Sequence, residues 1–163
     1  MTADRKEELR GRIEARRRIK ATADLHDRLL DFFGDAEGWQ VLPPEESGPR
    51  DDALSTVISR AKKDSAMTMR RDITREEMVS EACRMLADHP ADDDVLVGFE
   101  DPQVGLFLLK NRLLVDHAVP LLEFDRDTLV ACGLDYRWGF ILERFEHTGW
   151  VEYEMRFWNF PYN

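Results

Sequence analysis

The stretch 138–158, WGFILERFEHTGWVEYEMRFW, constrains the fold more than any other part of the chain. Two runs rich in aromatic and apolar residues flank residues 147–149 (HTG), and the glycine readily adopts the positive φ that a tight hairpin loop needs. We therefore predict a β-hairpin. Because strand side chains alternate between faces, a loop of two or four residues gathers one apolar face, whereas a loop of three residues opposes apolar to charged residues. The predicted apolar face consists of Trp138, Phe140, Leu142, Tyr153, Met155 and Phe157.

The opposite face of this hairpin combines carboxylates with large aromatic rings. Glu143 falls opposite Glu154 or Glu152, and like charges directly across a strand pair are destabilising. One interpretation is that Arg156 and Arg144 neutralise the carboxylates while a loop covers the tryptophans. The other is a partner-binding surface, because aromatic residues and arginine are enriched at interface hot spots. The predicted partner-binding residues are Glu143, Phe145, Trp150, Glu152, Glu154, Arg156 and Trp158.

Charge is distributed unevenly along the 163 residues. The formal net charge is −10, but residues 1–20 carry eight Lys or Arg against four Asp or Glu, which leaves −14 for the remainder. Such a body repels phosphate backbones and steers basic proteins towards itself. The sequence therefore favours a basic protein partner. Nucleic acid remains an alternative only through Arg16, Arg17 and Arg18, and a homo-oligomer through the same basic helix is a third possibility.

The hydropathy pattern predicts a cytoplasmic protein that does not associate with membranes. No apolar run approaches the length of a membrane-spanning helix, and the N-terminal residues are charged. The two cysteines, Cys83 and Cys132, lie in apolar surroundings without a CxxC spacing, so we expect two buried thiols and no disulfide.

The N-terminal half is expected to be helical. Residues 1–36 are predicted to form one long helix with a basic, exposed front half, and 37–50, rich in Pro and Gly, a linker or surface loop. Residues 51–90 are predicted to form a helical pair. The stripe expected to dock the long helix on the body consists of Ile19, Ala23, His26, Leu30 and Phe33.

Within the helical pair, the first helix is expected over 51–63 and the second over 75–88, with 67–72 as a connector. Thr74 and Glu77 have the spacing of a capping box, which marks the start of the second helix.

The remainder, 91–163, is predicted to be an acidic mixed region that forms one compact domain with 51–90. A strand is expected over 95–99, a second strand over 119–124 and a short helix over 126–132. Residues 101–116 fit either a buried helix, which we favour slightly, or a hairpin. The predicted fold class is α+β, with one long and two short N-terminal helices packed on a small C-terminal antiparallel or mixed sheet that ends in a β-hairpin.

No catalytic motif stands out in the sequence, and no cofactor is expected. The four histidines are scattered singly. Two sets of carboxylates form the enzymatic alternative: Glu143 with Glu152 or Glu154 as an acid and base pair, and the strand-end residues as ligands of a divalent metal. The strand-end carboxylates are Glu100, Asp101, Glu123 and Asp125.

Three functional hypotheses follow. The first is a small acidic interaction protein, such as an inhibitor or immunity-type antagonist, that binds a basic protein through the acidic-aromatic hairpin face. The alternatives are a small hydrolase or metal-dependent enzyme that uses the clustered carboxylates, and an oligomeric scaffold assembled through the N-terminal helix.

Overall fold

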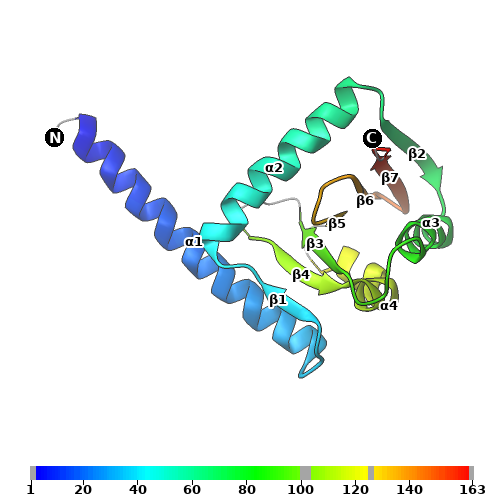
Figure 1. Ribbon diagram of the computed structural model, residues 1–163, viewed down its shortest axis with the longest axis horizontal. Coiled ribbons are helices and arrows are strands. Elements are labelled where there is room, and N and C mark those ends of the chain that lie inside the picture. The colour runs from blue at the N-terminus through cyan, green and yellow to red at the C-terminus, as the bar shows by residue number, and fades with distance from the viewer. Residues whose placement is uncertain (1–2, 100–103, 125–126, 162–163) are drawn as a thin grey trace.

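The computed structural model describes residues 3–99, 104–124 and 127–161 (Figure 1). Its helices are α1 (Ala3–Phe33), α2 (Pro44–Lys63), α3 (Arg75–Ala87) and α4 (Asn111–Leu122). Its strands are β1 (Trp39–Val41), β2 (Met67–Ile73), β3 (Asp94–Gly98), β4 (Phe107–Lys110), β5 (Thr128–Gly133), β6 (Trp138–His147) and β7 (Trp150–Asn159). None of the helices in these ranges is long and apolar enough to span a membrane.

The seven strands form one antiparallel sheet in the order β1-β4-β3-β5-β6-β7-β2. The α+β class is confirmed. The sheet is larger than expected, because both of its edge strands come from the N-terminal half of the chain. The connector predicted at 67–72 is strand β2, and the linker predicted at 37–50 contains β1 and the first two turns of α2. Pro44 does not prevent the early start of α2, since proline is well suited to the first helical position.

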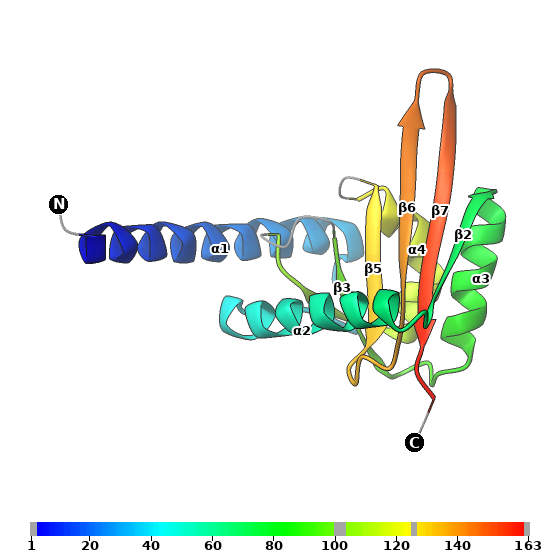
Figure 2. The same cartoon turned by 90° about the horizontal axis from the view of Figure 1, so that it is seen from above.

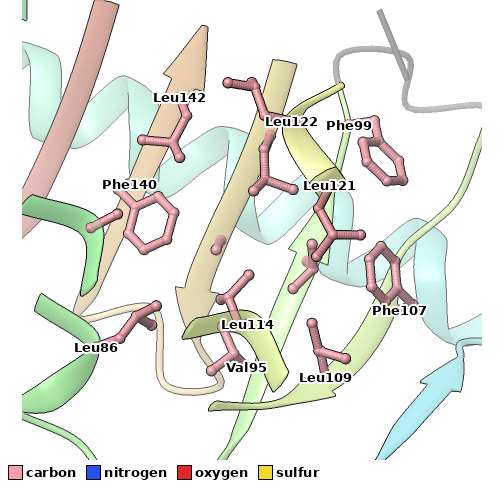
Figure 3. Packing of buried hydrophobic residues seen from close by; sticks show 14 of the residues in the cluster. Leu86, Val95, Phe99, Phe107, Leu109, Leu114, Leu121, Leu122, Phe140 and Leu142 are labelled. Atoms are coloured by element: carbon pink, nitrogen blue, oxygen red, sulfur yellow. The ribbon is translucent and has the colours of Figure 1, made fainter. Parts of the chain in front are cut away.

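One face of the sheet carries the main core. The sheet lies between α2 on one side and α3 with α4 on the other (Figure 1). Apolar residues of β3, β4 and β6 meet the buried sides of α3 and α4, as Figure 3 shows for Val95, Leu109, Phe140 and Leu142 around Leu114. Each of these side chains is buried, and full burial stabilises by roughly 1.5–3 kcal/mol apiece.

Helix α1 joins the same core through its last three turns. Leu25, Leu29 and Phe33 are buried there, and Phe33 also stacks on Trp39 of β1. The docking stripe predicted for this helix was wrong apart from Phe33, because Ile19, Ala23, His26 and Leu30 are exposed. The buried face is rotated from the predicted one. By contrast, the expectation of an exposed front half agrees with the exposure of every side chain from 5 to 20.

The segment between β3 and β6 differs most from the sequence prediction. Residues 107–122 contain strand β4 followed directly by α4, so neither the single helix nor the hairpin predicted over 101–116 is correct; residues 101–103 lie outside the described ranges. The strand predicted over 119–124 belongs largely to α4. Of the helix predicted over 126–132, residues 128–132 belong to β5, and residue 126 lies outside the described ranges. Here β5 pairs with β3 and β6 on its two sides, and this tertiary pairing overrides the local helical pattern.

Candidate functional site: the outer face of the terminal hairpin

The terminal hairpin folds as its sequence predicts. His147 pairs with Trp150, which leaves Thr148 and Gly149 as a two-residue loop, and Gly149 has a φ of +91°. Phe140 pairs with Phe157, and both face the α3–α4 core. The other side of β6 and β7, which we call the outer face, therefore carries all seven residues predicted to bind a partner.

The carboxylates at the middle of the outer face are paired with arginines. Glu143 lies directly opposite Glu154, and Arg156 forms an ion pair with each of them. Glu154 is buried and also accepts a hydrogen bond from Nε of Arg71 at 2.8 Å. Arg144, which we expected to help, lies on the opposite face and pairs with Asp127 at 3.0 Å. The centre of the face is thus electrically balanced, not acidic.

Helix α2 covers the end of the outer face nearest the C-terminus. Trp158 is fully buried in a second apolar cluster with Leu54 and Ala61 of α2, and its indole N–H donates to the Tyr136 carbonyl at 3.2 Å. Gly139, opposite Trp158, leaves room for the ring, since a Cβ there would lie 2.3 Å from its Cζ2 atom. Trp158, one of the residues predicted to bind a partner, is therefore a core residue that α2 covers.

The tip of the hairpin is the part of the outer face that remains exposed. Phe145 is 41% exposed and Trp150 is 54% exposed, and Figure 2 shows β6 and β7 projecting past the ends of β2 and α3. The His147 imidazole stacks on Trp150 with 3.9 Å between ring centroids, and its Nε2 lies 3.2 Å from a carboxylate oxygen of Glu152. Three of the predicted residues, Phe145, Trp150 and Glu152, thus lie on one face of the projecting tip.

Strand β2 adds residues that sequence reasoning missed. Arg71 neutralises Glu154, and Met69, which pairs with Arg156, is 45% exposed on the same face. The alternation of Met67, Met69 and Arg71 has the period of a strand, and it was the available signal in the segment interpreted as a connector.

The enzymatic alternative gains little from the geometry. Glu143 and Glu154 are held by arginines, and Glu123 pairs with Arg75 at 3.5 Å. Glu100, Asp101 and Asp125 lie outside the described residues. Within the described ranges, no group of three or more His, Cys, Asp or Glu side chains is placed to hold a metal ion.

Each of the four histidines packs against an aromatic ring. Their ring partners are Trp39 for His26, Trp138 for His89, Phe32 and Phe33 for His117, and Trp150 for His147. These contacts account for the histidines as packing residues.

No protein-family model, curated protein or solved structure matches this chain.

Proposed function

We propose that the chain is a small interaction protein that binds a basic protein partner through the tip of the β6–β7 hairpin. The observation that carries the proposal is the exposure of Phe145 and Trp150 on the same face of the projecting hairpin tip. Large exposed rings of this kind form the anchors of protein interfaces.

The charge around these rings supports a basic partner. The side chain of Glu146 is 71% exposed, and Arg144, 3.9 Å away, is already bonded to Asp127. Besides Glu146, Glu152 is a second carboxylate at the hairpin tip. Strands β6 and β7 together carry four glutamates and two arginines, and the chain beyond residue 20 carries −14. Long-range attraction would therefore speed association with a cationic surface, and the rings would slow dissociation.

An inhibitor or immunity-type antagonist of a basic toxin or nuclease is the particular form of this activity that we propose. A projecting hairpin tip with an aromatic anchor can enter the cleft of an enzyme, and its carboxylates can pair with the cations that such a cleft presents to an anionic substrate. The hairpin is held at its base by the arginine-paired carboxylates and by Trp158. Such anchoring would reduce the conformational entropy that the hairpin loses on binding.

A photo-crosslinking residue in place of Thr148 tests the proposal. We expect it to label one basic protein in a saturable way, and we expect that labelling to fall about tenfold or more when Phe145→Ala and Trp150→Ala are combined. Leu134→Ala is the matched control, since Leu134 is an exposed apolar residue on the turn between β5 and β6. Labelling that survives the double substitution, or a labelled protein that is acidic, would reject the hairpin tip as the site.

A further inference from the structure

The first half of α1 buries none of its side chains against the rest of the molecule. Every side chain from residue 5 to 20 is exposed, and both views show this half, which we call the arm, projecting away from the body (Figures 1 and 2). Residues 3–20 extend about 27 Å at 1.5 Å per residue. An isolated helix of this length is only marginally stable in water, so the arm is expected to gain stability from a partner.

The arm has two chemically different faces. Helical spacing places Leu9 and Ile13 on one side among cations, and these two apolar side chains are 50% and 44% exposed. This side, the basic face, comprises Arg5, Lys6, Leu9, Arg12, Ile13, Arg16, Arg17 and Lys20. The other side carries Glu7, Gly11, Glu14 and Ala15, and it runs into the stripe that α1 buries against the body at Leu25 and Leu29.

A groove follows this second side where α1 passes the start of α2. Two adjoining pockets of about 450 and 470 Å³ lie there, and Glu14, Arg18, Pro44 and Glu45 line both of them. Asp51 and Asp52 line the first pocket, and Gly11, Ala15 and Ile19 give the second an apolar floor. We call this the α1–α2 groove. Its four carboxylates against Arg18 leave it with three negative charges.

The surroundings of the groove disfavour the ionised form of one of its carboxylates, Asp51. Burial, and then the neighbouring Asp52, raise the pKa of Asp51 above its ordinary value, and Arg18 offsets this only in part. A cation placed in the groove would relieve both effects, because an opposite charge favours the ionised carboxylate.

We propose that the basic face of α1 in one molecule docks in the α1–α2 groove of a second copy. Leu9 and Ile13 match the apolar floor in chemistry, and the flanking cations match the carboxylates in sign. The two surfaces lie on opposite sides of one straight helix, so an arm cannot reach its own groove. The contact is consequently heterologous, and repetition closes a ring or extends a chain.

Other anionic partners fit the arm less well. A phosphate backbone or an anionic bilayer would meet a basic face backed by the acidic groove and by a body of charge −14. Insertion into a bilayer would also have only Leu9 and Ile13 to bury on that face, without an aromatic residue. A second copy of the chain, by contrast, carries the complementary groove, and every molecule that has an arm also has a groove.

A charge swap tests this proposal independently of the hairpin. In one variant Arg12→Glu and Arg16→Glu reverse the basic face, and in the other Glu45→Lys and Asp52→Lys reverse the groove. Sedimentation should show concentration-dependent association of the native protein, weakened about tenfold or more between about 0.1 M and about 1 M salt as the Debye length falls from about 10 to about 3 Å. Each variant alone should be monomeric, and an equimolar mixture should associate again.

Lys62→Glu with Lys63→Glu is the matched control. It makes the same change in net charge as the arm variant at the exposed far end of α2, and it should leave association intact. A native protein that stays monomeric at low salt, a mixture that stays monomeric, or a control that dissociates as fully as the arm variant would overturn the proposal. Far-UV circular dichroism of each variant shows whether its body is folded.

Discussion

Glu143 and Glu154 lie directly opposite each other across β6 and β7, although both are carboxylates. Their repulsion is offset by Arg156, which pairs with each of them, and by Arg71, which β2 brings to Glu154. The pair therefore has a structural role, since it ties the edge strand β2 to the base of the hairpin. This arrangement divides the outer face into a neutral base and an exposed tip, and the tip carries the large exposed rings Phe145 and Trp150.

Replacing Arg156 with Met should destabilise the protein by about 3 kcal/mol. The substitution leaves two facing carboxylates with one fewer cation, and breaking a largely buried pair on one side typically has an effect of this size. Chemical denaturation at neutral pH measures the change. The triple variant Glu143→Gln, Glu154→Gln and Arg156→Met removes the uncompensated charges and should recover most of the loss. Equal stability of the single variant and the native protein would show that the pairing is dispensable.

The two tryptophans of β7 should respond in opposite ways to truncation. Trp158→Ala empties a fully buried site beneath α2 and should cost about 3–5 kcal/mol, whereas Trp150→Ala changes an exposed side chain and should stay within about 0.5 kcal/mol. Urea titrations of both variants provide the comparison. A large loss of stability for Trp150→Ala would mean that the tip ring supports the fold, and it would weaken the binding proposal.

The hairpin was predictable because its determinants are local. The turn glycine and the period-two pattern of 138–158 fix the loop and the register without reference to the rest of the chain. The capping box at Thr74 and Glu77 is equally local, and both of its hydrogen bonds are present. The edge strands could not be recognised in the same way, because β1 and β2 are short or polar and take their identity from the strands that they pair with.

The candidate site was predicted only in part, because alternation is a local property whereas burial depends on distant parts of the chain. Alternation correctly assigned Glu143, Trp150 and Trp158 to one face, but burial along that face depends on where α2 crosses it. The sequence offers no local signal for that crossing. A helix packed across a sheet is set by contacts between residues about a hundred positions apart, such as Leu54 with Trp158.

Asn111 should be sensitive to substitution despite its position at the start of a helix. Its buried side-chain amide donates to the carbonyls of Leu86, His89 and Pro90 at 2.8, 3.0 and 3.2 Å, and so joins the end of α3 to α4. Asn111→Ala removes these three hydrogen bonds between the end of α3 and α4 and should cost about 2 kcal/mol. Asn111→Asp should cost more, because it places a carboxylate against three carbonyl oxygens. Unchanged denaturation midpoints for both variants would contradict this role.

The two thiols should differ in reactivity in the folded protein. Burial raises the pKa of Cys132 to about 12, and it also raises the pKa of the half-buried Cys83, where Asp116 adds to the effect. Since only the thiolate reacts, alkylation at mildly alkaline pH should be slow at Cys83 and slower still at Cys132. Mass spectrometry should show one label in the native protein and two in denaturant, and Cys83→Ser should abolish the native label. Rapid native labelling at Cys132 would show that the α2 side of the sheet opens readily.

Stability should fall in acid partly through the α3 capping box. Hydrogen bonds from the backbone N–H and then the hydroxyl of Thr74 lower the pKa of Glu77 below its ordinary value of 4.5. A lowered pKa in the folded state stabilises at pH above the unfolded value, and this stabilisation is lost as pH falls through the folded pKa. Glu77→Gln should therefore lower the melting temperature at pH 7 and match the native protein once the pH is well below 4.5.

Glu76→Gln is the control for this pH effect, because it removes a charge from the same helical turn without touching the cap. It reports the part of the change that comes from the helix dipole alone. Thr74→Ala, which removes the hydroxyl that accepts from the Glu77 N–H at 3.1 Å, should cost about 1 kcal/mol. If Glu77→Gln and Glu76→Gln gave the same melting curves across this pH range, the capping box would have no specific part in acid stability.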